Sequence, residues 1–196
     1  MPLTLPAAPG FATFAIRGES VVASAESGFS KQVQVYDWGG KRWTVTASLP
    51  VMSLDNAREW EAFFRRLNGR AGTFYLHDAP IMAGRGAARG APIVATVSGK
   101  TLNLTGFLAS TVSQVAVGDW LQIGDRLYQA ETQADADVTG AASLDVWPEP
   151  PSAVTAGDVV ILLEPKGEFR LLDTPEIVYR TDGLAAGFEF VAVSEV

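Results

Sequence analysis

His77, the only histidine of the chain, is the first residue that suggests catalysis. It stands next to Asp78 at the end of the stretch WEAFFRRLNGRAGTFYLHD, and a histidine oriented by a carboxylate can activate a nucleophile. Neighbouring residues of a strand point to opposite faces, so Asp78 is badly placed to orient His77. The chain also lacks a GxSxG motif and has no cysteine. We therefore interpret this stretch as a structural joint and expect neither catalytic residues nor an enzyme.

Two loops have the composition of ligand sites without the full spacing. DADVTG, which starts at Asp135, imitates the first half of a calcium loop, but its twelfth position is Val146 instead of a bidentate acid. GRGAARG, which starts at Gly84, resembles a phosphate-binding loop, but Arg89 stands where the third glycine is required. The sequence predicts a polar turn at the first loop, an interdomain linker at the second, and neither a metal nor a cofactor.

Aromatic residues in the second half of the chain offer a different chemistry. Trp120, Tyr128 and Trp147 could stack on a sugar ring, although alternating aromatics in a small β region more often belong to its core. A pair of carboxylates for glycoside hydrolysis cannot be assigned among 22 acidic residues without spatial information. Sugar stacking by Trp120 or Trp147 therefore remains an alternative to core packing.

Composition and charge limit the function classes. The chain of 196 residues has a net charge of -7 and 47% hydrophobic residues, so a packed core is expected and specific binding to nucleic acid is disfavoured. The absence of cysteine excludes disulfides, thiol catalysis and cysteine-based zinc sites. The first residues have no basic segment and are not expected to be a signal peptide. No apolar run reaches the roughly 18 residues that a membrane helix needs.

One helix is expected, beginning at Ser53 or Asp55 and ending at Gly69. Trp60, Phe64 and Leu67 recur at spacings of three and four, so we expect them to pack this helix against a sheet. Strand TFYLHD follows the helix. Before it, residues 31–49 show period-two alternation on both sides of Gly39-Gly40, which predicts a hairpin that turns at these glycines. The alternating apolar residues of that hairpin are Val33, Val35, Trp43, Val45 and Leu49.

The remaining segments predict a mainly β protein with two domains. Residues 1–10, rich in proline, read as an extended segment. Short strand candidates separated by Gly-containing turns fill residues 93–163, which is typical of a small β barrel or sandwich. The C-terminal strands need the sheet that the N-terminal hairpin supplies. We therefore predict a discontinuous domain of residues 1–78 and 165–196, with a small β domain inserted at 79–164.

The order of these features resembles the distal tail protein family of long-tailed bacteriophages and gene-transfer agents. The resemblance rests on GGKRWTVTASLPVMS, on WEAFFRRLNGRAGTFYLHD, and on GDWLQIGDRLYQAETQADADVTGAASLDVWPEPP followed by EPKGEFRLL and FEFVAVSE. It implies a tail-tube-like β-sandwich or split barrel with one flanking helix. It also implies a ring, usually of six subunits, that joins the tail tube to the baseplate hub and lets DNA pass through its lumen without specific binding.

The leading hypothesis is accordingly a structural virion protein at a phage tail tip, assembled in the bacterial cytoplasm. Its expected partners are further copies of itself, the tail tube protein and other tail-tip proteins, with no membrane insertion. We expect the hairpin at 31–49 to contact neighbouring subunits through strand edges. A carbohydrate-binding module that uses residues 79–164 for host recognition is the alternative, and a hydrolase that uses His77 is the third possibility.

Overall fold

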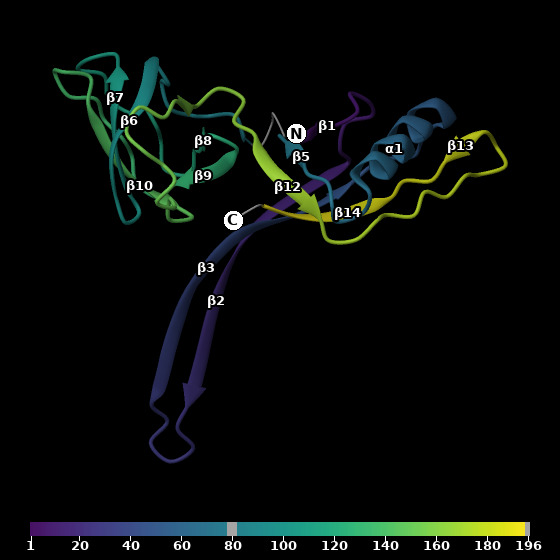
Figure 1. Ribbon diagram of the computed structural model, residues 1–196, viewed down its shortest axis with the longest axis horizontal. Helices are drawn as coiled ribbons and strands as arrows, with labels where there is room; N and C mark the ends of the chain where they lie inside the picture. Colours follow the sequence, from purple (N-terminus) through teal and green to yellow (C-terminus); the bar gives the residue numbers. More distant parts are fainter. Residues whose placement is uncertain (78–81, 195–196) are drawn as a thin grey trace.

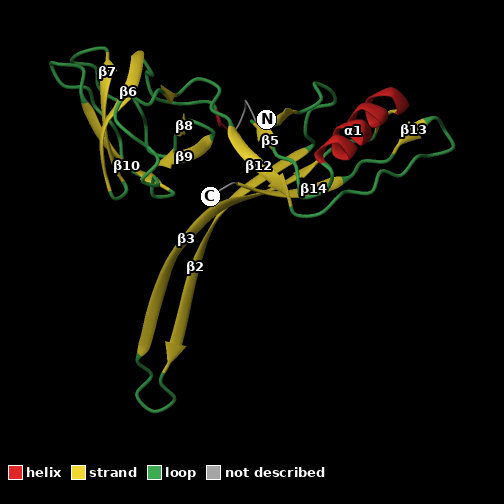
Figure 2. Cartoon of the chain, viewed as in Figure 1, coloured by secondary structure: helices red, strands yellow, loops and turns green. Residues whose placement is uncertain are grey.

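The computed structural model describes residues 1–77 and 82–194. It shows a body that carries the helix, a barrel-like sheet at the opposite end, and a long two-stranded hairpin that projects away from both (Figure 1). Strands predominate along the chain, and the described residues contain one helix (Figure 2). The predicted fold class, mainly β with one flanking helix, is confirmed.

The body is built on a six-stranded sheet. Its strands are β1 (Leu3–Thr4), β2 (Thr13–Glu26), β3 (Val33–Ser48), β5 (Phe74–Leu76), β12 (Gly167–Leu171) and β14 (Glu189–Ser194). Their order is β1-β5-β12-β14-β3-β2, so strands from both ends of the chain lie side by side. Strand β1 pairs with β5 in parallel, and the other neighbours are antiparallel. A separate short pair joins β4 (Met52–Ser53) to β13 (Leu184–Ala185).

Helix α1 (Leu54–Leu67) covers the apolar core of the body. Ser53 caps its first turn by accepting a hydrogen bond from the Asn56 amide, and Asn68 ends it in the left-handed conformation with φ 52°. The predicted packing residues Trp60, Phe64 and Leu67 are at most 3% exposed and lie in the body core. Burial of each such side chain contributes roughly 1.5–3 kcal/mol, so this face holds the helix to the sheet.

Part of the N-terminal segment joins the body sheet. Leu3 and Leu5 pack against the body core, and the Leu3 amide donates to the Thr73 carbonyl at 2.9 Å. The indole of Trp60 donates to the Ala8 carbonyl at 3.1 Å. The segment is extended, as predicted, but two of its residues form strand β1, because the sheet edge at β5 supplies backbone partners.

The second sheet also has six strands. They are β6 (Gly90–Ser98), β7 (Thr101–Phe107), β8 (Trp120–Ile123), β9 (Arg126–Ala130), β10 (Ala142–Trp147) and β11 (Val160–Ile161), in the order β11-β8-β9-β10-β7-β6. A bridge between Ile93 and Val159 brings its two ends together, so the sheet is a nearly closed barrel. We call residues 90–161 the barrel. The proposed boundary between residues 78 and 79 lies outside the described residues.

Inside the barrel, the hydroxyl of Tyr128 is buried and has no hydrogen-bond partner among the described residues. We expect Tyr128→Phe to raise the free energy of unfolding by about 1 kcal/mol, because the substitution removes an unsatisfied polar atom and keeps the ring. Urea unfolding at pH 7 measures this change. Tyr36→Phe, at an exposed position, is the control and should leave stability unchanged.

The same hydroxyl predicts a sensitivity to alkali. Burial raises the pKa of Tyr128 to about 12, whereas a tyrosine in an unfolded chain ionises near about 10. Between these values the unfolded chain loses the proton and the native chain keeps it, so this contribution to stability is lost as pH rises from about 10 to 12. The Phe variant should lose less stability than the unsubstituted protein over that range. A less stable Tyr128→Phe variant at pH 7 would contradict the interpretation.

Candidate intersubunit interface

The projecting hairpin is the most unusual feature of the surface. Strands β2 and β3 pair from Thr13↔Ser48 to Glu26↔Val33, and the chain turns through residues 27–32. The predicted turn at Gly39-Gly40 is therefore wrong. These glycines lie inside β3, because β2 runs from residue 13 to 26 and pairs with β3 on both sides of them.

Gly39 and Gly40 instead mark an irregularity in the pairing. The register passes from Ser20↔Lys41 to Val22↔Asp37, so three residues of β3 face one residue of β2. Gly39 has φ +74°, a conformation that costs glycine little, and its amide donates to the Asp37 carboxylate at 2.8 Å. We call residues 21–40, beyond the Ser20↔Lys41 pair, the arm. Gly39 and Gly40, which suggested a turn, thus lie where the arm joins the part of β3 that belongs to the body sheet.

The arm exposes many apolar side chains. Seven large ones are between 49% and 104% exposed: Val21, Val22, Phe29, Val33, Val35, Tyr36 and Trp38. No residue of the arm belongs to either apolar core cluster. An isolated two-stranded hairpin is at best marginally stable in water, and contiguous exposed apolar surface marks interaction sites. The arm therefore has the properties of a segment that packs against a partner.

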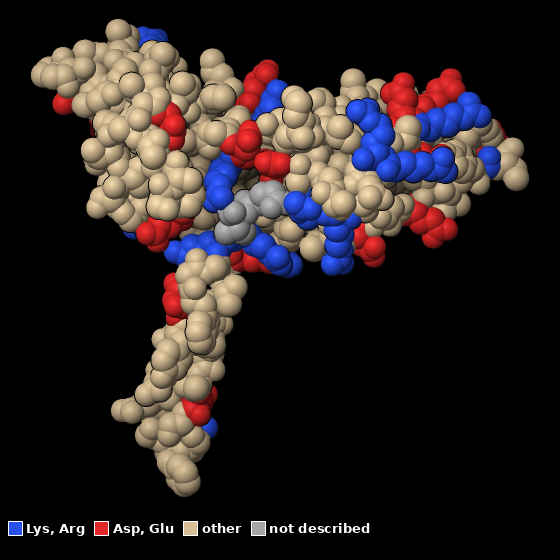
Figure 3. Space-filling model, in the orientation of Figure 1, with Lys and Arg blue, Asp and Glu red and all other residues tan. Residues whose placement is uncertain are grey.

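Both faces of the arm contribute to this surface. Cross-strand partners share a face, so Val22, Val33 and Val35 lie on one side with Ser24, Glu26 and Asp37. The pair Ala23↔Tyr36 lies on the other side with Ala25 and Gln34. Figure 3 shows few charged side chains along the arm, with Lys and Arg gathered where it leaves the body. Glu26 and Lys31 form an ion pair at 3.1 Å near the tip.

The predicted hairpin residues fall into two groups. Val33 and Val35 are 58% and 63% exposed and lie on the arm. Trp43, Val45 and Leu49 are at most 5% exposed and belong to the body core, so they are not available to a neighbouring subunit. The correction follows from the register, which pairs residues 41–48 with β2 and residues 44–48 also with β14 in the body sheet.

A network of ion pairs stands at the root of the arm. Glu19 accepts hydrogen bonds from Arg42 at 2.9 Å and from Arg17 at 2.7 Å. The contact with Arg42 is the main reason that the pKa of Glu19 lies below its usual value. Because these side chains reach water, the network contributes little to stability, but it fixes opposite charges beside the apolar arm.

The two tryptophans predicted to stack on a sugar pack against the body and do not form an open binding surface. Trp120 is 5% exposed, and its ring centroid lies 4.7 Å from that of Trp43. Trp147 is half-buried, and its ring centroid lies 4.2 Å from that of Trp43 in an edge-to-face arrangement. The predicted stacking role of Trp120 is therefore corrected, because the body occupies the space beside its ring. Trp147 already packs against the root of the arm.

His77 lies where the chain leaves the body sheet. Its Nδ1 is 2.8 Å from the Pro165 carbonyl oxygen, and because a carbonyl only accepts, Nδ1 carries the proton. The Nε2 atom is buried and has no partner among the described residues, while Asp78 lies outside them. His77 thus links the end of β5 to the segment that enters β12.

The imitation calcium loop is a turn held by its own side chain. The Asp137 carboxylate accepts hydrogen bonds from the amides of Thr139 and Ala141 and from the Thr139 hydroxyl, at 2.7–2.9 Å. These bonds lower the pKa of Asp137, with the Thr139 hydroxyl as the largest cause. Within residues 1–77 and 82–194, no group of three or more His, Asp or Glu side chains is arranged to hold a metal ion.

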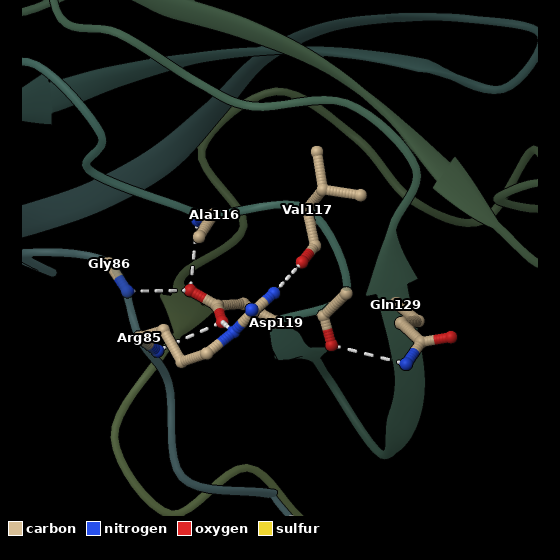
Figure 4. Close-up of polar contacts among 7 residues, drawn as sticks. Arg85, Gly86, Ala116, Val117, Asp119 and Gln129 are labelled. Atoms are coloured by element: carbon tan, nitrogen blue, oxygen red, sulfur yellow. Dashed lines mark hydrogen bonds and ion pairs between the residues drawn. The ribbon is translucent and has the colours of Figure 1, made fainter.

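The glycine-rich loop binds a carboxylate of its own chain. Asp119, 5% exposed, accepts hydrogen bonds from the amides of Arg85, Gly86 and Ala116 at 2.8–2.9 Å (Figure 4). The Arg85 side chain also donates to the Val117 carbonyl. The amides that suggested a phosphate site are therefore occupied, and the predicted linker is fastened to the barrel in this segment.

Sequence reasoning missed the central role of Asp119 and much of the arm. Asp119 is one of many acids next to a glycine, and only its three amide donors distinguish it. For the arm a signal was present, because FATFAIRGESVVASAE has no proline and is rich in β-forming residues. Read as one strand, it would have predicted a partner of equal length.

Comparisons with models of known protein families and with curated protein sequences found no match for this chain. Among the described residues, no helix has the length and apolar character needed to cross a membrane.

Proposed function

We propose that this chain is a structural virion protein that forms a ring at the tail tip of a long-tailed bacteriophage. In this role it is a distal tail protein or an adjacent tube-like baseplate component, between the tail tube and the baseplate hub. The observation that carries the proposal is the arm, an exposed apolar two-stranded ribbon that projects from a well-packed body. The sequence resemblance to distal tail proteins supports it independently.

The physical argument concerns what the arm lacks within one copy. A stable ribbon needs a third strand or a packed face, and the described residues supply neither beyond the Ser20↔Lys41 pair. The outer edge of β2 is also the end of the body sheet and has free backbone donors and acceptors. A ring meets both needs, because each copy receives the arm of one neighbour and extends its own to the next.

The alternative, a carbohydrate-binding module, receives no support from the barrel. Its two candidate residues, Trp120 and Trp147, pack against Trp43 of the body instead of presenting an open ring face. For an enzyme that uses His77, the described residues place neither a nucleophile nor an orienting carboxylate in hydrogen-bond contact with the imidazole. We therefore retain the structural proposal alone.

We expect the purified chain to form a closed oligomer larger than a dimer. Light scattering over a concentration series measures the mass, and negative-stain imaging of the largest species shows whether a central hole is present. The measurement is repeated after addition of the tail tube protein of the same phage, because some rings assemble only on a partner protein. A strict monomer under both conditions would contradict the proposal.

A further inference from the structure

A cluster of three tryptophans joins the barrel to the body at the root of the arm. Trp43 comes from β3 of the body, Trp120 from β8 and Trp147 from β10 of the barrel. The ring centroid of Trp43 lies 4.7 Å from that of Trp120 and 4.2 Å from that of Trp147. We call these three residues the tryptophan joint. Trp120 belongs to the apolar core cluster of the body, and Trp147 packs against that cluster, so side chains of the barrel cover part of the body core.

Gly18 of β2 completes the joint. It pairs directly with Trp43, three residues before the first residue of the arm. A Cβ atom at Gly18 would lie 2.5 Å from Cη2 of Trp147, which is closer than nonbonded carbons approach. The absence of a side chain at this position therefore lets the Trp147 indole lie directly on the β2–β3 pair.

Further contacts hold the same junction from both sides. The Trp43 indole donates to the Leu127 carbonyl at 3.0 Å, and the Tyr75 hydroxyl donates to the Asp125 carboxylate at 2.6 Å. The Glu168 amide of β12 donates to the Asp125 carbonyl at 2.8 Å. Several directed bonds between two packed units leave little freedom for rotation of one against the other.

We infer that the tryptophan joint makes the barrel a strut that fixes the direction of the arm, with Gly18 and Trp147 as positioning residues. The arm reaches about 30 Å past its root, given about 3.3 Å per strand residue, so a rotation of about 10° at the root moves the tip by about 5 Å. Such a displacement is larger than packed side chains tolerate at an interface. The consequence for ring assembly rests on the proposed function, whereas the rigidity itself does not.

The rigidity can be measured without any ring. Because the chain has no cysteine, Ser24→Cys on the arm and Ser143→Cys on the exposed face of β10 can be spin-labelled selectively. Double electron–electron resonance on the dilute monomer should give one narrow distance distribution. In Gly18→Val, which substitutes no barrel residue but displaces the Trp147 indole, we expect the distribution to broaden at least twofold or to be displaced. Trp147→Ala should have the same effect.

Ala15→Val is the matched control, because it adds a β-branched side chain to an exposed position of the same strand. It should keep the narrow distribution. An unchanged distribution in Gly18→Val, with urea unfolding confirming a folded chain, would overturn the inference. This result would leave the proposed function standing.

The effect on assembly is tested separately. If the unsubstituted chain forms rings, folded Gly18→Val should lose them or form irregular oligomers, whereas Ala15→Val should form normal rings. Rings of unchanged diameter from Gly18→Val would overturn the role of the joint in assembly. Failure of the unsubstituted chain to form rings would count against the proposed function alone, since the spin-label distances still report on the joint.

Discussion

Replacement of residues 21–40 by Asn-Gly is expected to give a folded chain that forms no ring. Ser20 and Lys41 are directly paired, so a two-residue turn can join them, and Asn-Gly suits such a turn. The replaced segment contributes no residue to either core cluster, so the free energy of unfolding should change little. The substitution removes all seven exposed apolar side chains of the arm, and with them the surface that we propose to contact the neighbouring copy.

This cut differs from removal of residues 31–49, which the sequence alone would have suggested. That larger deletion also removes Trp43, Val45 and Leu49 from the body core, so a loss of rings would only report unfolding. Light scattering and negative-stain imaging compare the shortened and full-length chains, with circular dichroism and urea unfolding as tests of folding. Rings of unchanged size from the shortened chain would refute the role of the arm.

A double substitution tests the same surface without shortening the chain. Val33→Asp with Val35→Asp places two charges on one face of the arm, and burial of unpaired charge costs several kcal/mol per ion. We expect association to weaken by roughly 100-fold or more, equivalent to about 3 kcal/mol. Gln32→Asp with Gln34→Asp adds the same charge at polar positions next to the two valines, one at the end of the turn and one on β3. Equal weakening by both pairs would indicate that net charge matters, and not the valine face.

Asp119→Ala is expected to lower the free energy of unfolding by about 3 kcal/mol or more. The carboxylate accepts from three backbone amides and lies 3.7 Å from the Arg85 guanidinium. Without it, these donors lose their partner at a site that is almost closed to water. Urea unfolding at pH 7 measures the loss, and amide hydrogen exchange should show weaker protection at Gly86 and Ala116.

Two further substitutions test whether the loss of stability comes from the hydrogen bonds of the Asp119 carboxylate. Asp119→Asn retains one carbonyl oxygen and can keep the bonds from Gly86 and Ala116, so its loss should be smaller than that of Asp119→Ala. Asp173→Ala removes an exposed carboxylate whose hydrogen bond comes from the amide of the next residue, Thr174, and should cost well under 1 kcal/mol. If Asp119→Ala and Asp173→Ala destabilised the chain equally, Asp119 would not hold the loop to the barrel.

These predictions depend on features that sequence reasoning reached to different degrees. The helix was predicted with its packing face, because Trp60, Phe64 and Leu67 recur at a spacing that only a helix turns into one side. The mainly β class followed from period-two alternation and frequent turn residues. Both patterns are local, since a few neighbouring residues decide which backbone conformation buries their apolar groups.

Local sequence patterns could not predict the position of the hairpin turn. Gly39-Gly40 between two alternating runs has the local character of a turn, yet the same residues form an irregularity inside β3. The choice depends on whether β2 is one strand or two, which is a property of a segment some twenty residues away. Pairing between distant strands decides it, because backbone groups of one strand must be satisfied by the other.

What the sequence by itself determined is therefore the set of elements, namely one amphipathic helix, many short strands, and a core of aromatic and aliphatic residues. Only the tertiary structure decided which apolar residues remain outside. Val35 and Val45 have the same side chain on the same strand, yet one is exposed on the arm and the other is buried in the body. The difference arises because residues 44–48 lie between two strands and share a core with the helix, whereas the arm extends past the other described elements of its own chain.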